Sequence, residues 1–231
     1  MIKAIVTDIE GTTSSLSFVK EVLFPYARAK LPEFVNLHKS DLAVKQLLAD
    51  TCAIAGVACN CETDTSIAIK QLIEWIDQDK KITPLKALQG LIWESGYQQG
   101  DFSGHLYPDA IANLKAWKAK GIALYVYSSG SVLAQKLLFG HTEAGDLTPL
   151  FSGFFDTNIG DKKAADSYRK IAEEIGITPA NILFLSDIKE ELDAAKAVGY
   201  QTIWLVRDQK PLAHLEHVQV LNFDDIDLDN L

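Results

Sequence analysis

The chain is poor in cysteine. Its 231 residues include three, Cys52, Cys59 and Cys61, and a count that is both low and odd does not indicate a disulfide framework. Cys59 and Cys61 stand too close together for the usual spacing of zinc-finger ligands, and no histidine lies near them in the sequence. We therefore expect three ordinary reduced thiols.

Long apolar runs are absent as well. No run approaches the length that a membrane-spanning helix requires. The first residues, Met1-Ile2-Lys3, lead into a short apolar segment that ends at an acid, without the basic region, long apolar stretch and cleavage site of a signal peptide. These absences predict a cytoplasmic protein that has no membrane as its partner.

Clusters of basic residues are also lacking. The chain has 22 Lys and Arg residues against 31 Asp and Glu, which gives a formal net charge of −9. Because binding to nucleic acid depends mainly on basic side chains that neutralise phosphates, we expect no nucleic-acid partner. A small phosphorylated substrate stays compatible with this charge, since a bound cation can supply the positive charge that the chain lacks.

The composition that remains is that of a globular protein, with 48% hydrophobic and 23% charged residues. Short apolar segments alternate with helical patterns over the second half of the chain, and one further apolar segment opens it. This order predicts an α/β fold with a doubly wound parallel sheet. The expected strands are residues 2–7, 122–127, 151–155, 182–185 and 202–206.

One long segment departs from this alternation. Between residues 16 and 99, apolar residues recur at helical spacing and no strand pattern appears. The polar, glycine-containing segment 96–104 is typical of a return loop. We therefore predict a core domain made of residues 1–15 and 105–231, into which an all-helical domain of residues 16–104 is inserted.

Polar side chains follow the predicted strands at the points where the strands end. In an open parallel sheet, ligands bind beyond the carboxyl ends of the strands. The candidate site residues at these positions are Asp8, Glu10, Ser128, Ser129, Lys162 and Asp187.

This set of side chains suits a metal-assisted transfer of a phosphoryl group. The carboxylate of Asp8 can attack phosphorus and form an aspartyl-phosphate, which water then hydrolyses. The approach is opposed by repulsion of ~4 kcal/mol for each pair of unit charges about 4 Å apart at an effective dielectric constant of about 20. A Mg²⁺ ion held by oxygen ligands, together with Lys162, reverses that balance. The hydroxyl groups of Ser128 and Ser129 can hold the remaining phosphate oxygens.

Each of these residues has a simpler explanation when it is taken alone. Asp8 can cap a turn, and Asp187 can be the N-cap of the helix that follows it. Ser128 and Ser129 can be N-caps too, and the adjacent Lys163 can take the role of the lysine. What favours a site is that all these residues occur in order, each at the end of a strand.

The residues resemble the motifs of the haloacid dehalogenase superfamily of phosphatases. Residues 8–12, Asp-Ile-Glu-Gly-Thr, are similar to its first motif, Ser128 or Ser129 to its second and Lys162 to its third; Ser186-Asp187, with Glu191 and Gly199, is similar to its fourth. The resemblance covers the whole chain and implies that the inserted helical domain is a cap. The chain departs from most of these phosphatases at Glu10, where they carry an aspartate.

Glu10 and several longer segments are similar to a narrower family, the enolase-phosphatases of methionine salvage. The segments are residues 7–13, 23–27, 127–132, 135–140, 155–157 and 167–172. This resemblance implies the substrate 2,3-diketo-5-methylthiopentyl 1-phosphate, which is enolised and then dephosphorylated to an acireductone. It also implies a monomer that works with one Mg²⁺ ion.

The resemblance assigns a role to each candidate residue. Asp8, Glu10 and Asp187 belong to the metal site, and Asp8, Glu10 and Lys162 act in catalysis. The substrate-binding positions are Ser128, Ser129 and Lys162. The role of Glu191 and the identity of the cap residues that contact the methylthio group stay open.

Two other functions are compatible with the pattern. One is a phosphatase or phosphomutase of the same superfamily that acts on another small phosphate ester, such as a sugar phosphate. The other is a binding or signalling domain, such as a receiver-like domain that is phosphorylated on an aspartate. The large helical insertion next to Asp8 disfavours a receiver, and the presence of Asp8, Lys162 and Asp187 together disfavours a domain that only binds.

Overall fold

The chain divides into two compact units. The computed structural model describes residues 1–60, 64–207 and 216–231. The first unit combines Met1–Leu16 with Ser103–Leu231, and the second is Ser17–Phe102. The second unit covers nearly the same residues as the inserted domain predicted at 16–104, and its action as a cap stays a prediction.

A six-stranded sheet forms the centre of the first unit, with strand order β3-β2-β1-β4-β5-β6. All neighbouring strands pair in parallel, which confirms the predicted doubly wound α/β fold. The strands are β1 (Ala4–Thr7), β2 (Ala123–Tyr127), β3 (Phe151–Phe155), β4 (Ile182–Ser186), β5 (Gln201–Leu205) and β6 (Val218–Val220).

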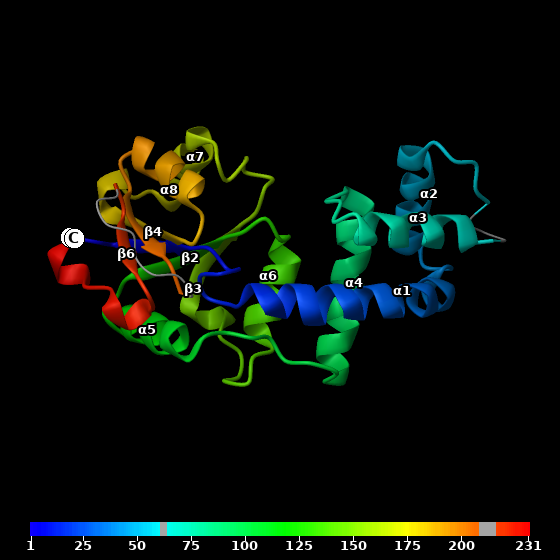
Figure 1. Ribbon diagram of the computed structural model, residues 1–231, viewed down its shortest axis with the longest axis horizontal. Helices are drawn as coiled ribbons and strands as arrows, with labels where there is room; N and C mark the ends of the chain where they lie inside the picture. Colours follow the sequence, from blue (N-terminus) through cyan, green and yellow to red (C-terminus); the bar gives the residue numbers. More distant parts are fainter. Residues whose placement is uncertain (61–63, 208–215) are drawn as a thin grey trace. The chain divides into compact units, whose positions relative to one another are not determined.

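Helices cover both faces of this sheet (Figure 1). They are α5 (Pro108–Ala119), α6 (Val132–Gly140), α7 (Ala165–Ile175) and α8 (Lys189–Ala197). Figure 1 shows α7 and α8 on one side of the sheet and α5 on the other. Four short 3₁₀ helices also occur among the described residues: Thr148–Leu150, Pro179–Asn181, Phe223–Asp225 and Leu228–Asn230.

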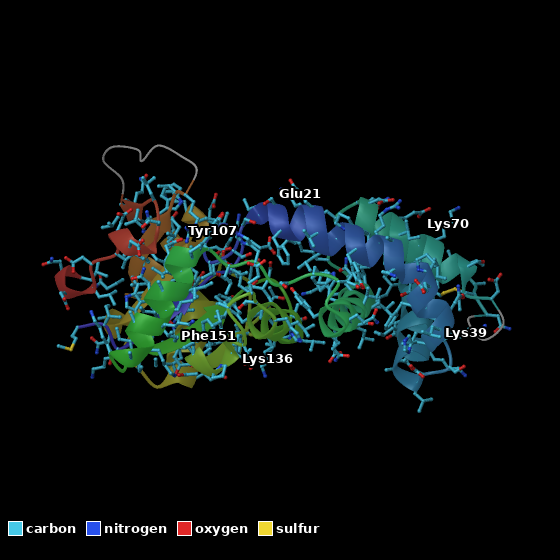
Figure 2. All side chains as sticks on the ribbon, turned by 90° about the horizontal axis from the view of Figure 1, so that it is seen from below. Glu21, Lys39, Lys70, Tyr107, Lys136 and Phe151 are labelled. Atoms are coloured by element: carbon cyan, nitrogen blue, oxygen red, sulfur yellow. A yellow bond between two sulfur atoms is a disulfide. The ribbon has the colours of Figure 1, made fainter. Side chains whose placement is uncertain are left out.

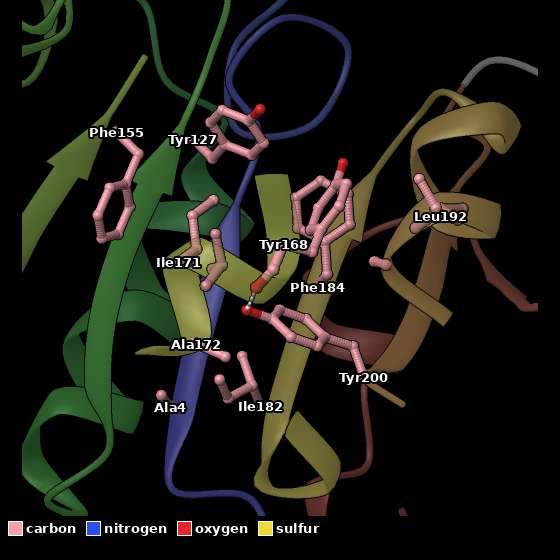
Figure 3. Close-up of a cluster of buried hydrophobic side chains, with 13 residues drawn as sticks. Ala4, Tyr127, Phe155, Tyr168, Ile171, Ala172, Ile182, Phe184, Leu192 and Tyr200 are labelled. Carbon is pink, nitrogen blue, oxygen red and sulfur yellow. Dashed lines mark hydrogen bonds between the residues drawn. The ribbon is translucent and has the colours of Figure 1, made fainter. Parts of the chain in front are cut away.

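The hydrophobic core on the α7 and α8 face is built from side chains of β1, β2, β3, β4 and these two helices, together with Tyr200 (Figure 3). Tyr168 from α7 and Phe184 from β4 are fully buried, and their ring centroids lie 5.0 Å apart. The hydroxyl group of Tyr200 donates to the carbonyl oxygen of Tyr168 at 2.8 Å. This packing holds the start of α7 against the central strands, close to where they end.

The prediction missed the last strand, because it closed the set at residues 202–206. β6 has only three residues, Val-Gln-Val, and one of them, Val218, is 58% exposed, so the segment is too short to show a strand pattern in the sequence. The predicted return loop also began too early, since α4 continues through Gly96 to Gln99.

The second unit is all-helical in its described residues. A π-helix, Phe18–Leu23, runs directly into α1 (Phe24–His38), and Pro25 stands in the first turn after this junction. The other helices are α2 (Leu42–Ala55), α3 (Ser66–Asp77) and α4 (Thr83–Gln99). None of the helices in the described part of the chain is both long and apolar enough to cross a membrane.

Cys52 and Cys59 form a disulfide within the second unit (Figure 2). The expectation of reduced thiols is therefore wrong for these two residues. α2 ends at Gly56, whose left-handed conformation (φ +68°) reverses the chain and brings the Cα atoms of the two cysteines to 6.2 Å. Cys61, the third expected thiol, lies outside the described residues.

Candidate active site

The central strands bring three of the predicted residues to one edge of the sheet. β1 pairs with β2 on one side and with β4 on the other, so Asp8, Ser128 and Asp187 follow three adjacent strands. The amide of Asp8 donates to the carbonyl oxygen of Leu185 at 2.9 Å, which extends the β1–β4 pairing to the candidate nucleophile. Asp8 is 4% exposed and Ser128 is 3% exposed.

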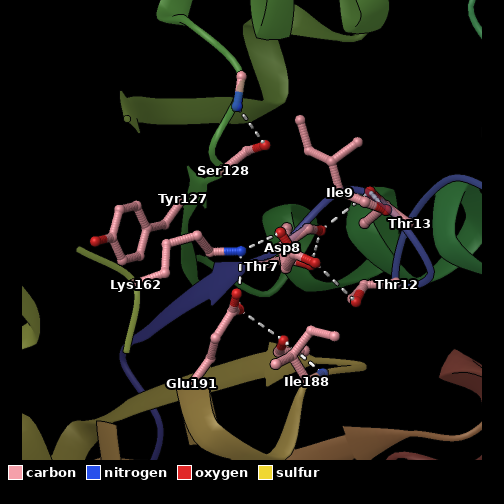
Figure 4. Close-up of polar contacts among 12 residues, drawn as sticks. Thr7, Asp8, Ile9, Thr12, Thr13, Tyr127, Ser128, Lys162, Ile188 and Glu191 are labelled. Atoms are coloured by element: carbon pink, nitrogen blue, oxygen red, sulfur yellow. Dashed lines mark hydrogen bonds and ion pairs between the residues drawn. The ribbon is translucent and has the colours of Figure 1, made fainter. Parts of the chain in front are cut away.

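Lys162 completes the centre of this site (Figure 4). Its ammonium nitrogen lies 2.5 Å from Oδ1 of Asp8 and 2.8 Å from Oε2 of Glu191. Burial lowers the pKa of Lys162, but the charges of Asp8 and Glu191 outweigh burial and raise the pKa above its usual value. Lys163, the alternative, is exposed, and its ammonium group faces Glu190 at 3.9 Å. The structure therefore places Lys162, and not Lys163, beside Asp8.

Glu191, whose role the sequence left open, is a buried member of the same cluster. It also accepts a hydrogen bond from the hydroxyl group of Ser186 at 2.9 Å. Burial and the charge of Asp8 raise the pKa of Glu191. Its position in the first turn of α8, four residues after Asp187, was the available signal, because that spacing returns a side chain to the end of the preceding strand.

Asp187 carries a buried oxygen that no donor satisfies. Its Oδ1 has no hydrogen-bond partner in the described part of the chain, and leaving such an atom unpaired costs about 1–3 kcal/mol. Burial, followed by the charges of Asp8 and Glu191, raises the pKa of Asp187 to about 7. Carboxylates therefore outnumber the Lys162 ammonium here, and an orphaned carboxylate oxygen among them fits a hard cation such as Mg²⁺.

The loop after β1 folds tightly against Asp187. Gly11 has φ +76°, and a Cβ there would lie 2.6 Å from Cγ of Asp187, so only glycine fits. The amides of Thr13 and Ser14 donate to the carbonyl oxygen of Ile9 at 2.9 and 2.8 Å. This turn fixes the backbone immediately beyond Asp8.

The hydroxyl group of Thr12 reaches the nucleophile candidate itself, donating to Oδ2 of Asp8 at 3.4 Å. Glu10 is half-buried in the same loop, and its backbone forms a single bridge with Ser14. This turn places Glu10 in the loop directly after β1, and its roles in the metal site and in catalysis stay predictions.

Ser128, Ser129 and Asp187 are not the N-caps of the helices that follow them. Ser131 is the N-cap of α6, since its hydroxyl oxygen accepts from the amide of Ala134 at 3.3 Å. Ser128 instead accepts from the amide of Gly130 at 3.2 Å, and Ser129 is half-buried in the loop between them. The residue at the N-cap of α8 is Ile188, so Asp187 is not a cap either.

A second group of possible metal ligands lies elsewhere in the first unit, formed by Asp193, Glu216 and His217. The ammonium of Lys189 already lies 2.9 and 2.8 Å from the two oxygens of Asp193. His217 faces Asp193 with Nε2 at 2.9 Å and the hydroxyl group of Thr202 with Nδ1 at 2.7 Å. These contacts satisfy the ligand atoms of Asp193 and His217 without a cation, in contrast to Asp187.

The comparisons with known proteins agree with this geometry. Residues 2–199 match the haloacid dehalogenase-like hydrolases. The chain is 59% identical over 226 residues to a protein of Methylococcus capsulatus named enolase-phosphatase E1, with 98% of each chain covered. It is 60% identical over 207 residues to the protein of the same name from Thioalkalivibrio sulfidiphilus, covering 90% of this chain and 91% of that one.

Solved structures show the same fold. The UTR4 protein of Saccharomyces cerevisiae is 34% identical, with a TM-score of 0.81, and the match covers 98% of this chain and 100% of that one. CbbY of Rhodobacter sphaeroides in complex with phosphate has a TM-score of 0.58 at 18% identity, covering 97% of this chain and 96% of that one. At that lower identity the likeness concerns the fold alone.

Proposed function

The chain belongs to the haloacid dehalogenase-like hydrolases and, among them, to the enolase-phosphatase E1 family, and from this membership we propose the reaction in full. The substrate is 2,3-diketo-5-methylthiopentyl 1-phosphate. The products are the acireductone 1,2-dihydroxy-3-keto-5-methylthiopentene and inorganic phosphate, formed in the salvage of methionine. The observation that carries this proposal at the site is the buried pair of Asp8 and Lys162, 2.5 Å apart, beside the unpaired oxygen of Asp187.

Asp8 acts as the nucleophile of the phosphatase step. Its carboxylate attacks phosphorus, the bond between phosphorus and the ester oxygen breaks, and the resulting aspartyl-phosphate is then hydrolysed by water. Lys162 lies against Asp8 and so faces the position that the phosphoryl group must occupy, where its ammonium offsets the negative charge. Ser128 and Ser129, at the end of the neighbouring strand, bind the remaining phosphate oxygens.

Mg²⁺ fits the carboxylates of this site, and Asp8, Glu10 and Asp187 are the residues that would hold it. The ion supplies positive charge that stabilises negative charge on the substrate's oxygens. Two observations support this assignment: Oδ1 of Asp187 has no hydrogen-bond partner among the described residues, and burial, followed by the charges of Asp8 and Glu191, raises the pKa of Asp187.

The enolase step requires a base, for which we propose Glu10. A proton leaves the carbon that bears the phosphate, and the electrons of that C–H bond form the enol double bond while the neighbouring carbonyl oxygen becomes the enol hydroxyl. Glu10 stands beside the metal site, and one methylene distinguishes it from the aspartate expected of ordinary phosphatases of the superfamily. The all-helical unit, Ser17–Phe102, is proposed as the cap over the substrate, and the enzyme as a cytoplasmic monomer.

Product identification tests the reaction directly. Wild-type protein incubated with the diketo phosphate and Mg²⁺ in D₂O should release phosphate, form the acireductone and exchange the proton on the carbon that bears the phosphate. NMR and the absorbance of the conjugated enol follow each event. Asp8→Asn should accumulate the phosphorylated enol, since enolisation does not need the carboxylate that attacks phosphorus.

Two results would contradict this proposal in different ways. If the protein released phosphate and left the unenolised diketone behind, it would be a phosphatase without enolase activity. Faster turnover of a sugar phosphate than of the diketo phosphate would favour the alternative substrate class instead.

A further inference from the structure

Three side-chain hydroxyl groups hold three successive carbonyl groups of the loop that carries Lys162. The pairs are Tyr127 with the carbonyl of Gly160 at 3.0 Å, Ser167 with that of Asp161 at 2.7 Å, and Tyr168 with that of Lys162 at 2.7 Å. Tyr127 ends β2, whereas Ser167 and Tyr168 lie in the first turn of α7. The loop is thus bound from two separate elements at every residue from 160 to 162.

All three donors are interior side chains. Tyr127 and Tyr168 are fully buried, and Ser167 is 1% exposed. A buried tyrosine hydroxyl group needs a partner, and a phenylalanine of nearly the same volume needs none. Packing alone therefore does not explain why the chain carries hydroxyl groups at these positions, and their shared feature is the loop that they bind.

The loop itself is shaped to lie against these donors. Gly160 has φ +151°, and a Cβ at this position would overlap the hydroxyl group of Ser167. Any larger residue would push the loop away from α7 and lengthen the hydrogen bonds that follow. Glycine at position 160 thus allows the approach on which all three contacts depend.

This anchoring of the backbone also affects the position of the Lys162 ammonium. A lysine side chain has a flexible stem of four carbons, so the ammonium stays in one place only when the backbone is fixed and the charge has partners. Here Asp8 and Glu191 are the partners, at 2.5 and 2.8 Å, and the ammonium also lies 5.8 Å from the centre of the Tyr127 ring. Both the backbone of Lys162 and its ammonium group are therefore fixed by contacts.

We propose that Tyr127, Ser167 and Tyr168 are positioning residues that act through Lys162. Their hydroxyl groups fix the backbone position of residues 160–162. They thereby fix the place where the ammonium of Lys162 meets the phosphoryl group. This inference rests on the proposed function, because it assumes that Lys162 faces a phosphate. Displacement of a reacting group by about 1 Å can cost about a hundredfold in rate, so small movements of this loop are expected to be measurable.

The test compares two buried tyrosines that lie side by side in the same core. Tyr168→Phe removes a hydroxyl group that binds the Lys162 carbonyl, whereas Tyr200→Phe removes one that binds the carbonyl of Tyr168 and leaves the loop untouched. With an aryl phosphate and Mg²⁺, Tyr168→Phe should lower kcat/KM about tenfold and Tyr200→Phe less than about twofold. Tyr127→Phe gives the same expectation as Tyr168→Phe through a different element, and it serves if the latter fails to fold.

Binding of inorganic phosphate, measured by calorimetry in the presence of Mg²⁺, provides a readout that does not need turnover. Tyr168→Phe should weaken it, and Tyr200→Phe should not. In a Lys162→Ala background, adding Tyr168→Phe should change phosphate binding less than about twofold, because the residue through which it acts is gone. A merely structural role would lower the melting temperature of both tyrosine variants without separating them in phosphate binding.

The outcomes distinguish the two proposals. Wild-type protein that binds phosphate but turns over no ester overturns the proposed function, and the binding comparison still decides the positioning role. Equal phosphate binding by Tyr168→Phe and Tyr200→Phe, or an undiminished effect of Tyr168→Phe without Lys162, overturns the positioning role. Wild-type protein that binds no phosphate overturns both.

Discussion

At the scale of residues, the site joins carboxylates that repel one another to the buried ammonium of Lys162. Lys162 contacts Asp8 and Glu191, and burial, followed by the charges of the same two carboxylates, raises the pKa of Asp187 to about 7. Removing Asp8 or Glu191 would relieve repulsion among the carboxylates, but it would also take a partner from the buried ammonium of Lys162. Buried groups with shifted pKa values of this kind are typical of functional sites.

Asp8→Asn should abolish phosphate release while the fold is kept. The substitution preserves size and takes one partner from the buried Lys162, but Glu191 stays at 2.8 Å from the ammonium and the repulsion of Glu191 and Asp187 falls, so the protein should stay folded. Loss of a nucleophile typically lowers kcat by about 10⁴-fold or more. Asp166→Asn, an exposed position in the first turn of α7, is the matched control. Phosphate release by Asp8→Asn within tenfold of wild type would rule out Asp8 as the nucleophile.

Asp187→Asn should raise the Mg²⁺ concentration needed for half-maximal activity by about tenfold or more, because it removes a charged oxygen ligand. Asp193→Asn should leave that concentration unchanged, since Asp193 is already paired with Lys189 and His217. Ca²⁺ should support turnover poorly, as it prefers more ligands at longer distances. Titration of each variant with Mg²⁺ measures the difference. Full activity after exhaustive chelation would contradict a metal site altogether.

At the scale of elements, close contacts between neighbouring segments decide which small residues are needed. Gly96 lies inside α4, where glycine ordinarily costs about 1 kcal/mol relative to alanine. A Cβ at this position would lie 2.6 Å from the Phe102 ring and 2.8 Å from the Tyr26 ring. The two aromatic rings pack edge to face at 4.8 Å, and Tyr26 also donates to Asp101 at 2.6 Å. The glycine therefore lets α1 and the end of α4 approach each other.

Gly96→Ala should lower the free energy of unfolding by about 1–3 kcal/mol, the usual effect of overpacking. Helix propensity alone predicts the opposite sign, so the direction of the change decides between the two effects. Ser95→Ala, at the preceding half-buried position, should stay within about 0.5 kcal/mol. Urea unfolding monitored by circular dichroism makes the comparison, and a more stable Gly96→Ala would show that the rings can move aside.

At the scale of the whole molecule, Arg207 links the loop after β1 to the C-terminal segment of the first unit. The guanidinium of Arg207 donates to the carbonyl oxygen of Thr12 at 2.7 Å and to both oxygens of Asp109 at 3.1 and 2.9 Å. Asp109 in turn accepts from the amide of Phe223 at 2.8 Å. Arg207 also stacks on Tyr107, at 3.7 Å from the ring centre. Segments from both ends of the chain thus meet at this ion pair.

Asp109→Asn should destabilise the protein by about 3 kcal/mol at neutral pH, because it leaves the poorly exposed Arg207 without its partner. Burial raises the pKa of Asp109, but the hydrogen bonds from Arg207 and Phe223 outweigh burial and lower the pKa below its usual value. A lowered pKa contributes stability that is present above the unfolded pKa of about 3.9 and is lost as the pH falls through the folded value. The difference in free energy of unfolding between wild type and variant should therefore shrink below about pH 4.

Urea unfolding at pH 7 and at successively lower pH checks this prediction. Asp224→Asn is the control. Asp224 is exposed and accepts a hydrogen bond from Asn113, which lies in α5 as Asp109 does. It should change the free energy of unfolding by less than about 0.5 kcal/mol. A difference between wild type and Asp109→Asn that stays constant down to pH 3 would contradict an ionised Asp109.

The amino-acid sequence by itself determined the class of fold and the order of the residues at the strand ends, because both follow from local patterns. Hydrophobic periodicity marks β1, β2, β4 and β5 wherever a strand is buried, and a parallel sheet brings the residues after such strands to one edge. It missed β6, whose three residues leave no pattern, and the disulfide of Cys52 and Cys59, which depends on the reversal at Gly56.

Only the tertiary structure decided which polar groups touch. Lys162 meets Asp8 across 154 positions of the chain, and no local signal separates it from the exposed Lys163 beside it. The burial of Glu191, the unpaired oxygen of Asp187 and the hydroxyl groups that hold the Lys162 loop are likewise properties of the packed core. The pKa of a carboxylate and the position of an ammonium depend on burial and on neighbouring charges, and both exist only after distant segments have come together.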